Sequence, residues 1–107
     1  MDQDQVFTAE AIRDTSSKTS DESATGEFTA ETIIIENGLD QQVTLQLQGC
    51  RQGGSTWFNV GSSFNVPAST DDYETVTDYF PCYRLTAICS TAPTSGDLDV
   101  WIIKSRR

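Results

Sequence analysis

The sequence predicts an all-β protein: a single antiparallel β-sandwich, jelly-roll or immunoglobulin-like, with about seven or eight strands. Three observations support this prediction. Residues 43–48 (VTLQLQ) alternate apolar and polar side chains without a break, which is typical of a strand with one buried face. Turn-forming residues recur at intervals of about 8 to 12 residues. No segment keeps a helical period of apolar residues over three turns.

The first 26 residues differ from the rest of the chain. Residues 6–12 (VFTAEAI) can form one strand, whereas residues 14–26 are almost all small and polar and bury too little surface to order themselves. We therefore expect residues 1–26 to be an N-terminal arm, an edge strand with a polar surface loop, and residues 27–107 to be the sandwich domain. The strand can join a sheet of this chain or of a neighbour, which makes Val6, Phe7 and Ile12 interface candidates.

Strands are expected next at residues 28–35, 43–48, 56–60, 64–66, 73–77, 82–89 and 98–103. Three consecutive isoleucines at 33–35 suggest a strand that is covered on both faces, at least locally. Asn37 and Gly38 mark a turn because this dipeptide favours positive φ. The side chains expected in the core are Phe28, Ile33, Ile35, Val43, Leu45, Leu47, Phe58, Val60, Phe64, Leu85, Ala87, Leu98, Val100 and Ile102.

A second turn motif lies at residues 50–57, Cys-Arg-Gln-Gly-Gly-Ser-Thr-Trp. It resembles the Asp-box hairpin, Ser-x-Asp-x-Gly-x-Thr-Trp, of sialidases and other β-rich proteins. Gly54, Thr56 and Trp57 match the motif, while Cys50 and Gln52 stand where Ser and Asp are usual. The resemblance implies a structural turn and no catalytic element, with Trp57 as a core or hairpin anchor.

Composition excludes several kinds of chemistry. The 107 residues contain no histidine and carry a formal net charge of −9, so a Ser-His-Asp or Cys-His nucleophile and histidine-ligated zinc are excluded. The negative charge opposes binding to nucleic-acid phosphates. No apolar run reaches the length of a membrane span, and residues 1–5 (MDQDQ) do not resemble a signal peptide. We expect no catalytic residues, metal or cofactor.

The charge is unevenly distributed. Residues 1–41 contain ten acids and two bases, whereas the last seven residues contain three bases, Lys104, Arg106 and Arg107, and no acid. These bases can pair with the acidic surface of a neighbouring copy in a ring or other head-to-tail assembly. The alternative is a frayed, solvated terminus.

Other candidate side chains each have two interpretations. Asp71, Asp72, Glu74 and Asp78 can form a carboxylate pair or a Ca²⁺ site, or simply a solvated acidic loop. The alternation in 98–103 turns Trp101 outward, either as an interface anchor or for burial under the N-terminal segment. Tyr79 and Tyr83 are further candidates, because their rings could stack on a sugar if they are exposed. The three cysteines, Cys50, Cys82 and Cys89, are expected to be free thiols, and Cys50 can meet another only if the fold brings them together.

A series of short features runs in order from Thr32 to Ile103: residues 33–40 (IIIENGLD), 43–49 (VTLQLQG), 53–57 (GGSTW), 60–62 (VGS), 73–81 (YETVTDYFP), 83–87 (YRLTA) and 92–102 (APTSGDLDVWI). This order of features resembles small virion proteins of tailed viruses, including viruses of halophilic archaea. The resemblance implies a non-enzymatic capsid decoration or turret subunit that assembles with itself, as a ring or trimer, and with the major capsid protein. Such a protein is made in the host cytoplasm and resides in the virion, without contacting nucleic acid or membrane directly. Alternatives are a neck or tail protein, a carbohydrate- or receptor-binding module, and a hydrolase with paired carboxylates.

The acid excess predicts a dependence of stability on salt. Only two of the seven bases are lysine, and at 1 M salt charge repulsion is screened within about 3 Å. If the protein is adapted to concentrated salt, its melting temperature rises between low and multimolar KCl. An ordinary acidic protein, the alternative interpretation, would show no such stabilisation in the same melting curves.

Overall fold

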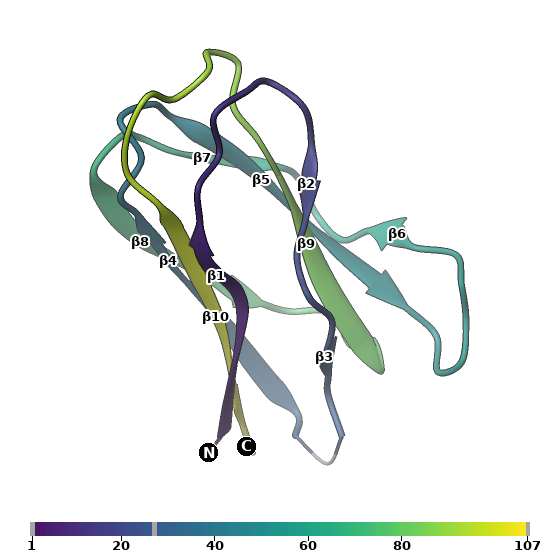
Figure 1. Ribbon diagram of the computed structural model, residues 1–107. Coiled ribbons are helices and arrows are strands. Elements are labelled where there is room, and N and C mark those ends of the chain that lie inside the picture. The colour runs from purple at the N-terminus through teal and green to yellow at the C-terminus, as the bar shows by residue number, and fades with distance from the viewer. Residues whose placement is uncertain (1, 27, 107) are drawn as a thin grey trace.

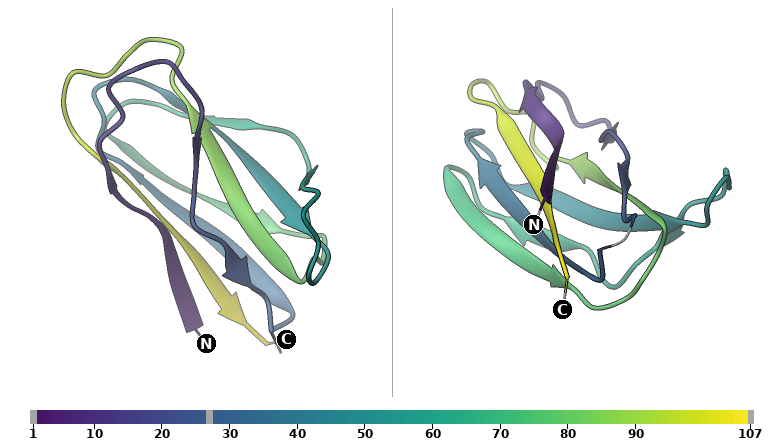
Figure 2. Two further views of the ribbon diagram at one scale, coloured as in Figure 1. Left: turned by 45° about the vertical axis from the view of Figure 1, so that its right-hand side comes forward. Right: turned by 90° about the horizontal axis from the view of Figure 1, so that it is seen from below.

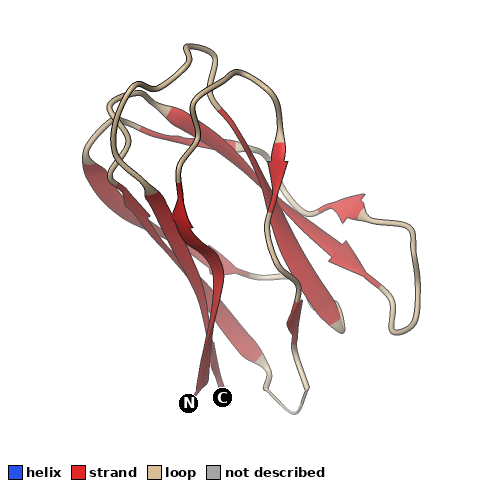
Figure 3. Ribbon diagram, in the orientation of Figure 1, coloured by secondary structure: helices blue, strands red, loops and turns tan. Residues whose placement is uncertain are grey.

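The computed structural model describes residues 2–26 and 28–106, in which all regular structure is β-strand (Figures 1 and 3). Two antiparallel sheets form a sandwich, which confirms the predicted fold class. The first sheet has the order β1-β10-β4-β8, and the second has the order β2-β9-β5-β6, with β3 also on β9 and β7 also on β5. The strands are β1 (Asp2–Glu10), β2 (Lys18–Thr19), β3 (Ser23–Ala24), β4 (Ala30–Asn37), β5 (Val43–Cys50), β6 (Phe58–Asn59), β7 (Phe64–Val66), β8 (Thr70–Val76), β9 (Cys82–Ile88) and β10 (Leu98–Ser105).

The core lies between the two sheets and follows the predicted alternation in β5, β9 and β10. Every second residue of these strands is buried and the residues between them are not, except at the end of β5, where Gly49 and Cys50 are both buried. The buried apolar residues of the core cluster are Val6, Phe7, Ile12, Ile33, Ile35, Leu39, Val43, Leu45, Leu47, Val66, Val76, Tyr83, Leu85, Ala87, Cys89, Leu98, Val100 and Ile102. Most of the predicted core residues are therefore in place.

Two expectations about apolar side chains are wrong. Phe58 is 54% exposed because β6 is only two residues long and lies at the end of its sheet. The isoleucines at 33–35 do not lie in a strand that is covered on both faces. Ile33 and Ile35 enter the core, whereas Ile34 is half-buried on the outer face, because successive side chains of a strand point to opposite faces.

The N-terminal strand belongs to the sheet of its own chain. β1 pairs with β10 along its length, from Asp2 opposite Lys104 to Glu10 opposite Leu98, so both termini lie at the same end of the molecule (Figure 1). The register shifts between Gln5 and Phe7. A β-bulge of this kind lets two successive side chains turn toward the same face, and Val6 and Phe7 are both buried in the core.

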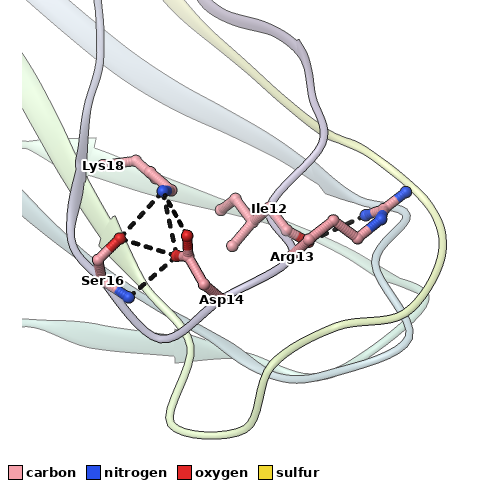
Figure 4. Close-up of polar contacts among 5 residues, drawn as sticks. All are labelled: Ile12, Arg13, Asp14, Ser16 and Lys18. Carbon is pink, nitrogen blue, oxygen red and sulfur yellow. Dashed lines mark hydrogen bonds and ion pairs between the residues drawn. The ribbon is translucent and has the colours of Figure 1, made fainter.

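The polar segment after β1 is more ordered than its composition predicts. Its short strands β2 and β3 pair with β9, and Ile12 is fully buried. Arg13 donates hydrogen bonds to the carbonyls of Ile12 and Gly96, both at 2.9 Å. Figure 4 shows how Lys18 and Ser16 close the loop on Asp14, with an ion pair of 3.1 Å from Lys18. Residues 12–24 are therefore held against the body of the sandwich by strand pairing and side-chain hydrogen bonds.

The predicted turn at Asn37 and Gly38 is present, but neither residue has positive φ. Asn37 is buried, and its amide donates to the carbonyls of Gln41, Val66 and Pro67. Gly38 is needed for close approach of two loops: a Cβ atom there would lie 2.9 Å from the Asp97 carbonyl oxygen. The turn is therefore defined by the hydrogen bonds of the Asn37 side chain and by the close contact of Gly38 with the Asp97 carbonyl, and not by positive φ.

Phe7 of β1 is buried in the core, so we expect it to contribute strongly to stability. We expect Phe7→Ala to lower the free energy of unfolding by about 3 to 5 kcal/mol, out of a total of about 5 to 15 kcal/mol for a domain. Urea unfolding followed by circular dichroism measures the difference. Thr8→Ala, an exposed position on the same strand, is the control and should change stability by less than about 0.5 kcal/mol. If Phe7→Ala lowered the free energy of unfolding as little as Thr8→Ala, the packing of β1 would not contribute to stability.

Candidate interaction surfaces

The outer face of the first sheet carries apolar side chains that no described segment of the chain covers. The register places Trp101 of β10 between Gln5 of β1 and Ile34 of β4, with Tyr73 of β8 next in the row. Ile103 lies two residues along β10 on the same face. We call Ile34, Tyr73, Trp101 and Ile103 the Trp101 face.

The Trp101 face is partly hollowed and partly exposed. A depression of about 240 Å³ is bounded by Gln3, Ile34, Glu36, Trp101 and Ile103. Tyr73 is 65% exposed, the most of any large apolar side chain in the described part of the protein. β1 lies beside β10 in the sheet and not over it, so the N-terminal strand does not bury Trp101. The outward orientation predicted for Trp101 is the one that the structure has.

The outer face of the second sheet carries a group of polar side chains that bond to one another, beside the exposed apolar residues Phe58 and Ile88. Arg84 of β9 donates a 2.8 Å hydrogen bond to the Gln48 side chain of β5. The guanidinium carbon of Arg84 lies 4.3 Å from the ring centroid of Trp57, within the range of a cation–π contact. Trp57 therefore anchors the 51–57 loop on the outer face, outside the core.

The predicted turn at residues 50–57 is closed by the backbone. The Gly54 amide donates to the Arg51 carbonyl at 2.9 Å, and Gly53 has positive φ. Thr56 and Gln52 are exposed. Residues 51–57 project from the body of the sandwich, as the right-hand view in Figure 2 shows. The segment that resembles an Asp-box is thus a turn. Trp57 holds this turn against the outer surface of the sheet through its contact with Arg84.

The three apolar interface candidates of the N-terminal arm lie inside the chain. Val6 and Phe7 are each 2% exposed and Ile12 is fully buried. They pack in the common core with residues of both sheets. In this structure, a neighbouring subunit could reach them only if β1 left its place beside β10.

One of the three bases at the C-terminal end, Lys104, forms an ion pair with Asp4 of the same chain. The Lys104 ammonium is buried and donates 2.8 Å hydrogen bonds to the Asp4 carboxylate and the Ala24 carbonyl. Ser23 donates to the same carboxylate at 2.7 Å. The hydrogen bonds that Asp4 accepts from Lys104 and Ser23 lower its pKa, and the bond from Lys104 has the larger effect. Arg106 is exposed, and Arg107 lies outside the described residues. Lys104 is therefore unavailable to a neighbour, which weakens the charge argument for head-to-tail contact.

Glu31 is a buried carboxyl group beside this ion pair. Its side chain is 3% exposed and its Oε2 atom has no hydrogen-bond partner among the described residues. It stands opposite Lys104 in the β4–β10 register and opposite Val76 on β8. Burial raises the pKa of Glu31, and the positive charge of Lys104 offsets this only in part. Sequence reasoning missed Glu31, although its spacing of two from the predicted core residues Ile33 and Ile35 places it on the inward face of β4.

The acids on and after β8 do not gather into a metal site. No group of three or more histidine, cysteine or acidic side chains suited to a metal occurs in residues 2–26 and 28–106. Asp71, Asp72 and Asp78 are exposed. Glu74 and Asp78 border a groove of about 310 Å³ between the edge of β8 and residues 60–64, whose floor includes Ile33 and Leu47. The part of the chain described here has no helix that could cross a membrane.

Of the aromatic candidates Tyr79, in the loop before β9, and Tyr83, in β9 itself, one is exposed and one is buried. Tyr83 is 1% exposed, and its hydroxyl donates to the Asp78 carbonyl at 2.7 Å and accepts from the Phe80 amide at 2.9 Å. Burial raises the pKa of Tyr83 to about 12. Tyr83 fixes the corner and cannot stack on a sugar, whereas Tyr79 is 60% exposed.

The fold is shared with solved structures of low sequence identity. The PBSX exported protein XepA matches with a TM-score of 0.74 and 14% identity over 98% of this chain and 37% of that chain. PirA matches with a TM-score of 0.56 and 17% identity over 95% of this chain and 92% of that chain. A structure of infectious bursal disease virus, Gx strain, matches with 12% identity over 98% of this chain and 33% of that chain. Its TM-score of 0.42 is too low to carry an argument.

No protein-family model matches the sequence, and no curated protein matches it. The chain spans little more than a third of the length of XepA. At these identities the similarity is one of fold: the β-sandwich is shared, at a distance, with a protein of a phage-like element. A fold alone does not assign a function.

The raised pKa of Glu31 predicts a pH dependence of stability. Between its pKa in the unfolded chain, about 4.3, and its higher pKa in the folded protein, only the unfolded state releases the proton. The contribution of Glu31 to the free energy of unfolding is therefore full below this window. It falls as pH rises through the window, by up to about 1.4 kcal/mol per pH unit. Glu31→Gln should abolish this fall in urea unfolding between about pH 4 and pH 8.

Glu36→Gln is the matched control because Glu36 lies exposed on the same strand. It should keep the pH dependence of the natural protein. If Glu31→Gln also runs parallel to the natural protein at every pH, then Glu31 does not titrate with a raised pKa.

Proposed function

We propose that this protein is a non-enzymatic structural subunit of a virus or phage-like particle, which associates with copies of itself through the Trp101 face. The observation that carries the proposal is the apolar outer surface of the first sheet. Contiguous exposed apolar side chains on a soluble protein commonly mark a site of association. Tryptophan and tyrosine are the side chains that contribute most often to interface energy.

The arrangement of the apolar side chains supports this choice of surface. On the second sheet, Trp57 packs on Arg84, and the exposed Phe58 and Ile88 lie on different strands, β6 and β9. On the first sheet, Trp101, Ile34 and Ile103 border a depression that no described segment fills. A second copy placed against this sheet would remove the depression from water and bury the row of side chains.

The acidic surroundings of the Trp101 face shape the association. Glu36 of β4 is opposite Asp99 of β10 and Asp71 of β8 in the register, so one end of the face is negatively charged. Two copies brought together there would repel one another at low salt, and salt would screen that repulsion. Self-association that strengthens with ionic strength fits the acid excess of the whole chain.

The finer assignment rests on the resemblance in the order of sequence features and on the shared fold of XepA. We place the protein on the capsid as a decoration or turret subunit, bound to the major capsid protein and made in the host cytoplasm. A neck or tail position in the same kind of particle is the alternative. Mass spectrometry of purified particles, with the oligomeric state of the isolated protein measured alongside, distinguishes a particle component from a free protein.

A carbohydrate-binding module is the second candidate function, and one observation favours it. Tyr73 and Trp101 lie in one register row, separated by Ile34, and aromatic rings on a flat sheet can stack on sugar rings. A glycan array would detect such binding. Binding to an array, together with a monomeric protein at all salt concentrations, would favour this function over assembly.

The assembly surface is tested by replacing Trp101. We expect Trp101→Thr, which keeps a residue suited to strands, to shift the protein toward monomer by at least about tenfold in dissociation constant, equal to about 1.4 kcal/mol. Sedimentation equilibrium in low and multimolar KCl gives the constants. Ile88→Thr is the control, since Ile88 is an exposed apolar residue on the other sheet. Equal association of both variants and the natural protein would exclude the Trp101 face.

A further inference from the structure

Two of the three cysteines lie opposite each other in the second sheet, where β5 ends and β9 begins. Cys50 is the last residue of β5, Cys82 is the first residue of β9, and the register pairs them directly. Their neighbours in the register, Gly49 and Tyr83, are both buried on the core side. Because side chains alternate along a strand, both thiols lie on the outer side of the sheet.

This arrangement is within reach of a disulfide bond. Residues opposite one another on antiparallel strands have Cα atoms about 4.5 to 5.5 Å apart, and disulfides span Cα separations of about 4.4 to 6.8 Å. The cysteines are free thiols in the structure. The Cys50 thiol donates to the Arg51 carbonyl at 3.3 Å, and rotation about its Cα–Cβ bond is the movement needed to turn the sulfur toward Cys82.

The two thiols differ in their access to solvent. Cys50 is 2% exposed and lies under the 51–57 turn, close enough that a Cβ atom on Gly54 would be 3.1 Å from its sulfur. Cys82 is half-buried and lines a depression of about 220 Å³ with Gln52, Tyr79 and other residues. A small reagent can therefore reach Cys82 first, and Cys50 is placed to react with it second.

We propose that Cys50 and Cys82 are an oxidation site, which forms a reversible cross-strand disulfide with a low-molecular-weight disulfide as oxidant. The Cys82 thiolate attacks one sulfur of the oxidant and releases one small thiol, leaving a mixed disulfide on Cys82. The Cys50 thiolate then attacks the Cys82 sulfur and displaces the second small thiol. The two protons lost by the protein thiols end on the two small thiols, so that the protein is oxidised by two electrons and the oxidant is reduced by two.

The burial of Cys82 affects the rate of this reaction through the pKa of its thiol. Burial, with smaller contributions from Glu22 and Cys50, raises the pKa of the Cys82 thiol. Since the thiolate is the reacting form, oxidation is slow at neutral pH and accelerates as pH rises. A bond at this place joins β5 to β9 where the 51–57 turn begins, two residues from the Arg84 side chain on which Trp57 stacks. Oxidation would thus fix the turn to the sheet.

Cys89 provides the matched control. It is fully buried and follows the end of β9 on the core side, where β5 offers it no cysteine partner in the register. The proposal therefore predicts one specific pair out of the three that three cysteines could form.

The test incubates the folded protein with oxidised glutathione at several pH values, then digests it without reduction for mass spectrometry. A peptide that links residues 50 and 82 is expected in the natural protein and in Cys89→Ser, with a faster rate at higher pH and a higher melting temperature in the oxidised form. Cys50→Ser and Cys82→Ser, checked for folding by circular dichroism, should lack the link. A stable glutathione adduct on Cys82 with Cys50 still free would overturn the proposal, as would links to Cys89 in similar amounts.

Discussion

The pairing of β1 with β10 is the contact on which the rest of the structure depends. β10 lies between β1 and β4, so its inward residues Val100 and Ile102 are enclosed only when β1 is in place. The bulge between Gln5 and Phe7 sends two successive apolar side chains into the same core. Asp99 supports this irregularity, since it accepts hydrogen bonds from the Gln5 side chain at 2.9 Å and the Ala9 amide at 2.8 Å. The first strand of the chain thereby completes the sheet that the last strand would otherwise leave open.

That pairing also determines where the buried charges lie. β1 brings Asp4 to Lys104, and β4 brings Glu31 to the other side of the same lysine. An ammonium group held by one carboxylate and a backbone carbonyl has most of its hydrogen-bonding needs met. Glu31 is left as the poorly solvated member of the group, because Lys104 bonds to Asp4 and not to it. A charge that counts as part of a basic tail in the sequence is, in the fold, an internal link between the two ends of the chain.

The sequence was sufficient to predict strands wherever local pattern and tertiary environment agree. The alternation in β5, β9 and β10 identified their inward residues and the outward position of Trp101, because a period of two follows directly from strand geometry. β1 was less predictable since its bulge breaks that period at Val6 and Phe7. β2 and β3 could not be recognised, because strands of two residues owe their existence to backbone bonds with β9. The opposition of Cys50 and Cys82 depends on which strands pair, and no local pattern contains that information.

The candidate surface follows from a difference that folding alone does not require. Both sheets need one apolar face for the core, and the middle of the second sheet shows that the opposite face can carry polar residues such as Gln48 and Arg84. The first sheet instead carries Trp101, Ile34 and Ile103 on its solvent side, in a chain whose net charge of −9 otherwise favours solvation. An apolar outer face adds nothing to the packing between the sheets and exposes the protein to unwanted association. The proposed association with a second copy would give this face a role, and the flatness of a sheet surface suits another folded surface better than a small, enclosed ligand.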